Sequence, residues 1–159
     1  MKKDFKYNLA MLVLLVLLLT VTCKSAKAYD ENGEAHCLAK NIYFEAGNQP
    51  LAGRIAVAQV TINRRNHGMF PNTICEVVYQ GGETKHKCQF SWYCDGKSDV
   101  PTDSETWMES IILAFRIINF DDMDITEGSL WYHANYIDKP YWSAELTPTV
   151  VINNHIFYK

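Results

Sequence analysis

Glu45 is the residue whose setting most favours acid–base chemistry. Leu38, Ile42 and Glu45 are spaced at i, i+4 and i+7, which places them on one face of a predicted helix. Gly47 is typical of a residue just past a helix end, so the Glu45 carboxyl lies in the last turn. The helix dipole and partial burial disfavour the charged form there, which raises the pKa toward that of a proton donor near neutral pH. The spacing is also compatible with a glutamate that points to solvent at a frayed helix end.

Side chains that could bind a sugar follow in the middle of the chain. The amide of Gln89 and the hydroxyl of Ser91 can hydrogen-bond sugar hydroxyls or acetamido groups, and Trp92 can either stack on a sugar or pack in the core. Asp95 precedes a glycine, which is a turn signal. We interpret Asp95 as a turn residue, with a second catalytic acid as the alternative.

A second group of candidate binding residues lies near the C-terminus. Tyr132, Asn135, Tyr141 and Trp142 would suit a carbohydrate groove, where rings stack on sugars and amides hydrogen-bond them. His155 either hydrogen-bonds within such a site or stabilises a strand. We therefore expect a groove for a glycan.

Several stretches resemble the SleB/CwlJ-type cell-wall hydrolases, the spore-cortex-lytic family that also occurs in many bacteria and phages. They appear in the expected order between Cys37 and Phe157. The stretches are Asn41–Arg64, Phe70–Gln80, Cys88–Asp99, Gly128–Asn135 and Ile152–Phe157. The resemblance thus covers nearly the whole chain after the first 28 residues.

The resemblance implies both site residues and a fold. Glu45 matches the glutamate at the end of the family's first helix, which is its catalytic acid. Gln89, Phe90 and Ser91 resemble the family's QF[ST] motif, and His155 belongs to a stretch similar to its terminal motif. The implied fold is a lysozyme-like or lytic-transglycosylase-like α+β domain, with the glutamate beside a small antiparallel sheet.

The N-terminus has the pattern of a secretory signal peptide. Three lysines precede an apolar run at 9–22, and an Ala-Lys-Ala sequence at 26–28 fits a cleavage site. We expect residues 1–28 to be the signal and 29–159 to be one exported catalytic domain, secreted, periplasmic or associated with the cell wall. An uncleaved membrane anchor and a lipid attached to Cys23 are the alternatives.

Charge narrows the choice of partners. Loss of the predicted signal removes five lysines and one aspartate, which takes the formal net charge from −3 to −7. An acidic protein without a basic patch is unlike a nucleic-acid-binding protein. We expect a monomer that acts on peptidoglycan and needs no cofactor.

Four cysteines remain after the predicted cleavage, and an oxidising compartment would pair them in one of three ways. Cys88 and Cys94 flank a short run and can close on each other, which leaves Cys37 to pair with Cys75. Zinc is the competing interpretation, but the Cys88–Cys94 spacing is wider than the CxxC pair common in zinc sites.

Helical periodicity dominates the first two thirds of the chain and short strands end it, which is typical of an α+β fold. Arg64 and Arg65 suit the last turn of the second helix, where cations interact well with the helix dipole. The expected elements are helices over 34–46, 51–66, 73–79 and, after a capping box at 102–105, up to 119, and strands over 88–93, 129–133 and within 150–158.

Three classes of function are open. The favoured one cleaves glycan strands between N-acetylmuramic acid and N-acetylglucosamine. Glycosidases usually need two carboxylates, but a lytic transglycosylase, in which the sugar's own 6-hydroxyl attacks the anomeric carbon, needs only Glu45. The second is an amidase that cuts the sugar–peptide bond, with zinc held by His133, His155 and a carboxylate. The third is a non-catalytic wall-binding module.

Overall fold

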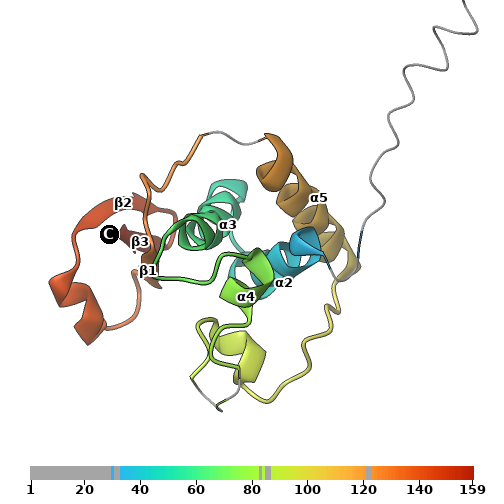
Figure 1. The fold of residues 1–159 in the computed structure, drawn as a ribbon, viewed down its shortest axis with the longest axis horizontal. Helices are drawn as coiled ribbons and strands as arrows, with labels where there is room; N and C mark the ends of the chain where they lie inside the picture. The colour runs from blue at the N-terminus through green and yellow to red at the C-terminus, as the bar shows by residue number, and fades with distance from the viewer. Residues whose placement is uncertain (1–29, 31–32, 83, 85–86, 121–122) are drawn as a thin grey trace, which may run out of the picture.

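The computed structural model describes residues 30, 33–82, 84, 87–120 and 123–159. A helical part lies beside a small sheet, as Figure 1 shows. The elements are α2 (Glu34–Ala46), α3 (Leu51–Asn66), α4 (Ile74–Val78), α5 (Ser104–Phe120), the 3₁₀ helices η1 (Ser91–Cys94) and η2 (Tyr141–Glu145), and the strands β1 (Trp131–Ala134), β2 (Pro148–Ile152) and β3 (His155–Tyr158). The predicted signal peptide lies outside the described residues. In the part that is described, no helix is long and apolar enough to cross a membrane.

Helix α2 is the centre of the helical part, where it packs against α3, α4 and α5. Leu38, Ala39 and Ile42 are fully buried in the main hydrophobic core. The helical spacing predicted a shared buried face, because residues three and four apart are neighbours on a helix. Both α2 and α3 have the bounds expected from the sequence.

Two disulfides join segments of this part, Cys37 with Cys75 and Cys88 with Cys94, the pairing that the spacing favoured. The first bond connects α2 to α4. The Glu34 carboxylate at the start of α2 reinforces that connection, because it accepts a hydrogen bond of 2.6 Å from the backbone N–H of Ile74.

The last turn of α2 is held against the start of α5. The Tyr43 hydroxyl accepts hydrogen bonds of 3.0 Å from the backbone N–H groups of Thr102 and Asp103. Asp103 rather than Thr102 caps α5, because its carboxylate accepts from the Thr106 N–H at 2.8 Å. A Cβ on Gly47 would lie 3.1 Å from the Thr106 methyl group, so the absence of a side chain permits this close approach.

The sheet has the order β1-β3-β2, and both pairs of strands are antiparallel. Tyr132 on β1 lies opposite Phe157 on β3. Phe157 is fully buried in a second hydrophobic cluster with Ala56 and Val60 of α3. Helix α3 therefore has one side in the main core and the other against the sheet, as its position in Figure 1 also shows.

The strand predicted over residues 88–93 is wrong. This segment is a loop that leads into the 3₁₀ helix η1, and all strands of the described residues come after position 130. Phe90 and Trp92 are buried while Ser91 is exposed, which is the alternation expected of a strand. Here the alternation arises in a short turn closed by the Cys88–Cys94 disulfide, where no neighbouring strand is available for pairing.

Candidate active site

Glu45, in the last turn of α2, borders two cavities of about 410 Å³ each. The first, which we call the tryptophan cavity, is lined by Glu45, Arg64, Cys88, Gln89, Phe90, Ser91, Trp131, Tyr132 and Trp142. The second, the tyrosine cavity, is lined by Tyr43, Phe44, Glu45, Gly47, Asn48, Gln49, Asp103, Thr106, Tyr136 and His155. Of the described residues, only Glu45 lines both.

The environment of the Glu45 carboxyl raises its pKa. Burial is the largest cause, since it disfavours the charged form. Two neighbours act in the opposite direction: the Tyr132 hydroxyl, which donates a hydrogen bond of 3.1 Å to Glu45 Oε2, and the charge of Arg64. The raised pKa favours a carboxyl that can give up a proton and, once ionised, is stabilised by Tyr132 and Arg64.

Tyr132 positions the Glu45 carboxyl from the sheet side. Its ring packs edge-on against His155, with 5.2 Å between centroids, and tilted against Phe157 at 5.6 Å. Burial and the nearby Glu45 charge raise the pKa of Tyr132 well above its usual value, so the hydroxyl stays protonated and donates. We predicted Tyr132 as a substrate-binding residue. The structure adds a hydrogen bond from its hydroxyl to Glu45, the candidate acid.

Replacing Tyr132 with phenylalanine should shift the pH profile of the proposed reaction. The hydrogen bond from Tyr132 favours the charged form of Glu45. Without this bond, the pKa of Glu45 should rise further. A general acid loses activity as the pH rises through its pKa, and the alkaline limb of kcat/KM should therefore move to higher pH. An alkaline limb that stays in place, or moves to lower pH, would show that Tyr132 does not control this ionisation.

Arg64 is a site residue that our sequence analysis did not identify. It is almost fully buried, and its Nε donates a hydrogen bond of 2.7 Å to the backbone oxygen of Leu130. Its guanidinium carbon lies 5.4 Å from the ring centroid of Phe70 and 5.2 Å from that of Phe90. Burial lowers the Arg64 pKa to about 10, which leaves it charged at neutral pH. The only signal in the sequence was a cation in the last turn of α3.

The structure brings most predicted binding residues to Glu45. Gln89, Phe90 and Ser91 line the tryptophan cavity, and His155 lines the tyrosine cavity. The Nδ1 atom of His155 is buried and has no hydrogen-bond partner among the described residues. Burial also lowers the His155 pKa, so the neutral ring is favoured.

Asn135 and Tyr141 are placed differently from expectation, because neither lines a cavity that contains Glu45. The Asn135 backbone N–H donates to Asn154 at 2.8 Å, so Asn135 joins β1 to the turn before β3. Tyr141 is 91% exposed, whereas its neighbour Trp142 lines the tryptophan cavity. A direct role for Asn135 or Tyr141 in binding therefore stays a prediction without support from this geometry.

Asp103 is the other carboxylate among the residues that line these cavities. The sequence indicated only its place in a capping box. Its capping hydrogen bonds with Thr106 lower the pKa of Asp103, so it is ionised at neutral pH. Asp95, the alternative second acid, lines neither cavity and instead binds the backbone N–H of Lys97 within its own turn at 2.8 Å.

The zinc site considered for an amidase is not assembled in the described part of the chain. Alternate residues of a strand face opposite sides of a sheet. His133 lies opposite Ile156 and His155 opposite Ala134, so the two histidines face opposite sides. Both His133 ring nitrogens are also engaged, with Ala134 O and the Tyr158 hydroxyl. No group of three His, Cys, Asp or Glu side chains in the described residues could hold a metal.

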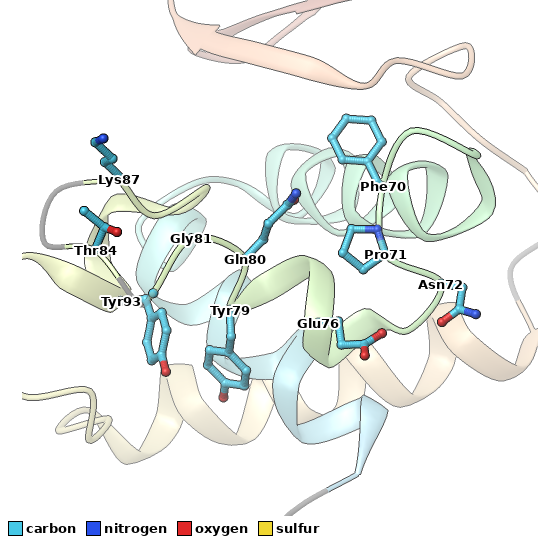
Figure 2. Close-up of a pocket in the computed structure, with 11 residues that line it drawn as sticks. Phe70, Pro71, Asn72, Glu76, Tyr79, Gln80, Gly81, Thr84, Lys87 and Tyr93 are labelled. Atoms are coloured by element: carbon cyan, nitrogen blue, oxygen red, sulfur yellow. The ribbon is translucent and has the colours of Figure 1, made fainter.

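A larger cavity, about 1110 Å³, lies elsewhere, along α4 and the loop that follows it (Figure 2). Its carboxylate, Glu76, is exposed and accepts a hydrogen bond from the Thr73 hydroxyl at the start of α4. Tyr79 and Tyr93 extend in the same direction in Figure 2, with 4.6 Å between ring centroids. We place the candidate active site at Glu45, because acid catalysis depends on a carboxyl with a raised pKa rather than on cavity size.

The fold is that of a lysozyme-like domain, with a helix that ends just after Glu45 beside a small antiparallel sheet. The sequence profile of the cell wall hydrolases matches residues 48–158, and the chain belongs to that family. The matched stretch begins just after Glu45 and does not include it. The support for a role of Glu45 is therefore the geometry of its carboxyl described above.

Relatives with known names agree with this assignment. The spore cortex-lytic enzyme of Bacillus subtilis (strain 168) is 37% identical over 126 residues, which are 79% of this chain and 37% of that protein. That of Bacillus cereus is 27% identical over 131 residues, 82% of this chain and 46% of that protein. The chain thus spans less than half the length of these two relatives.

Two solved structures share the fold. The catalytic domain of the Bacillus cereus SleB protein has a TM-score of 0.62 with 26% identity, and the match covers 84% of this chain and 94% of that domain. The catalytic domain of the germination-specific lytic transglycosylase SleB from Bacillus anthracis has a TM-score of 0.64 with 26% identity, covering 84% and 98%. These matches confirm the lysozyme-like fold.

Proposed function

We propose that this protein degrades peptidoglycan outside the cell membrane, by cleaving the glycan strand between N-acetylmuramic acid and N-acetylglucosamine as a lytic transglycosylase. The observation that carries the proposal is the Glu45 carboxyl, which has a raised pKa and borders two cavities at once. A chain that crosses Glu45 can place one sugar in each cavity, with the linking oxygen at the carboxyl. The kinship with spore cortex-lytic enzymes supports the same class of substrate.

In the proposed reaction, Glu45 first gives up its proton and then accepts a second one from the substrate. Since Oε2 accepts from Tyr132, Oε1 carries the proton and gives it to the glycosidic oxygen. The bond from the muramic anomeric carbon to that oxygen breaks, and its electron pair stays on the departing N-acetylglucosamine hydroxyl. The muramic 6-hydroxyl oxygen then bonds to the anomeric carbon, while its proton returns to Glu45. The product is a 1,6-anhydro-N-acetylmuramic end, and no water is consumed.

The intramolecular nucleophile explains how one carboxyl could be sufficient. A well-oriented tethered group can reach an effective concentration of about 10⁵–10⁸ M, so activation by a second carboxylate is not required. The protein needs only to hold the sugar in the conformation that brings its 6-hydroxyl to the anomeric carbon. Trp131 and Trp142 of the tryptophan cavity offer aromatic surfaces for such a sugar.

The identity of the digested fragments tests this proposal. We expect mass analysis of wall digests to show mainly anhydro-muramic ends, lighter than hydrolysed ends by one water molecule, and we expect the same products in EDTA. Reducing muramic ends as the main product would indicate a hydrolysing muramidase instead. Release of free peptides that stops in EDTA would indicate the amidase.

Asp103 gives a second test, because a hydrolytic enzyme could use it to activate water. Under the transglycosylase mechanism, Asp103→Asn should keep the rate within a few-fold of the unmodified protein. Asparagine is also a good helix N-cap, so α5 should be preserved, which circular dichroism and the melting temperature would verify. A rate reduced by about 10²-fold or more, the effect typical of losing a general base, would favour hydrolysis with Asp103 as that base.

A further inference from the structure

Arg64 and Gln89 form a fixed pair in the wall of the tryptophan cavity. Arg64 is held by its hydrogen bond to Leu130 O and by its contacts with the rings of Phe70 and Phe90. Its Nη1 and Nη2 atoms lie 3.0 and 3.3 Å from one end of the Gln89 side-chain amide. The residues come from the last turn of α3 and from the loop before η1, so packing alone brings them together.

Arg64 determines which end of the Gln89 amide faces the cavity. Every nitrogen of a guanidinium is a donor, so only the amide oxygen can face Arg64. The amide nitrogen of Gln89, with its two N–H groups, then points away from Arg64, on a residue that lines the cavity. Because Arg64 occupies its acceptor, Gln89 can offer a ligand only its N–H donors.

The positive charge of Arg64 favours the same kind of ligand group as the N–H donors of Gln89. No carboxylate of the described residues forms an ion pair with this buried guanidinium. A positive charge and N–H donors together favour a ligand group that accepts hydrogen bonds, and disfavour an ammonium group. The N-acetyl carbonyl of a wall sugar is such an acceptor, whereas a de-N-acetylated sugar has an ammonium in its place.

We propose that the Arg64–Gln89 pair makes this protein selective for N-acetylated glycan strands, with Gln89 donating to the acetamido carbonyl of the sugar in the tryptophan cavity. Gln89 contacts the substrate, and Arg64 is a positioning residue that orients Gln89. This selectivity rests on the proposed glycan-cleaving function and adds to it the chemical class of wall that is cut.

Three wall preparations test the selectivity: walls as isolated, walls that are chemically de-N-acetylated, and the latter after re-acetylation with acetic anhydride. We expect the de-N-acetylated walls to be cut at least about tenfold more slowly, since a site built to hydrogen-bond one group rejects an analogue that lacks it. Re-acetylation should restore the rate. Equal rates on all three preparations would overturn the proposal.

Gln89→Glu separates recognition by this pair from general effects of wall charge. A carboxylate at position 89 accepts hydrogen bonds from both Arg64 and a sugar ammonium, so the rate ratio between acetylated and de-N-acetylated walls should fall toward one. Gln80→Glu is the matched control, because Gln80 lines the separate cavity of Figure 2 and the change of charge is the same. This control should keep the ratio of the unmodified protein. An equal fall in both variants, or an unchanged ratio in Gln89→Glu, would contradict the proposal.

Binding gives a readout that does not depend on cleavage. Wall pull-down with the Glu45→Gln variant should show a preference for acetylated walls, and adding Gln89→Glu should abolish it. If the unmodified protein released no glycan fragments, the proposed function would be wrong, while the binding preference would still report on the Arg64–Gln89 pair. Absence of any preference in the Glu45→Gln variant would reject the selectivity.

Discussion

Glu45→Gln should reduce the rate of wall cleavage by about 10²–10⁴-fold, the range typical of losing a general acid. Glutamine has nearly the same shape, and its amide oxygen can still accept the hydrogen bond from Tyr132. It cannot, however, donate an acidic proton to the glycosidic oxygen. The release of soluble fragments from purified walls measures the effect, and circular dichroism verifies that the fold is preserved.

Glu76→Gln is the matched control for this change. Glu76 is exposed and lines the larger cavity of Figure 2, which Glu45 does not line, so the same substitution there should leave the rate unchanged within a few-fold. Lysis by Glu45→Gln at a rate close to that of the unmodified protein would remove Glu45 from the mechanism. If the unmodified protein bound walls and released no fragments, the wall-binding module would be the better description.

Loss of the Cys37–Cys75 bond should reduce the free energy of unfolding by about 3–4 kcal/mol. The estimate follows from the chain-entropy relation for a sequence separation of 38 residues. Such a loss is large beside the roughly 5–15 kcal/mol that stabilises a typical domain. Denaturant unfolding of the exported protein with both cysteines replaced by serine measures the change.

The Cys88–Cys94 disulfide allows a comparison between a short and a long loop. It closes only six residues, so the same relation predicts a smaller loss of about 2 kcal/mol. Peptide mapping without reduction should recover both pairs from the unmodified protein. Recovery of Cys37 joined to Cys88 or Cys94, or a larger loss from the shorter loop, would contradict this account.

The two cavities at Glu45 and the larger one along α4 show that size and chemistry need not coincide in this protein. The larger cavity has two tyrosines and an exposed carboxylate, whereas each smaller one includes the half-buried Glu45. A reaction that breaks a glycosidic bond needs a group that holds a proton near neutral pH. Burial at the end of α2 raises the pKa of Glu45 in that direction.

The sequence by itself determined the helices α2 and α3 and the position of Glu45 in the last turn of α2. Apolar residues at helical spacing, followed by Gly47 and Pro50, predicted where α2 ends, and the structure has that boundary. The spacing of the cysteines favoured the two disulfides that the structure has. These features could be predicted because each depends on residues close together in the chain, or on a choice among few pairings.

The tertiary structure decided which distant side chains reach Glu45. In the sequence, Arg64 was only a cation suited to a helix end, whereas its packing against Phe70 and Phe90 makes it part of the wall of the tryptophan cavity. Tyr132, far along the chain, reaches Glu45 because β1 lies beside β3, which packs on α3. The same alternation that predicted a strand at 88–93 occurs in a disulfide-closed turn. Local patterns indicate which face of an element is buried, but the neighbour that covers this face is set by long-range packing, for which a single sequence has no local signal.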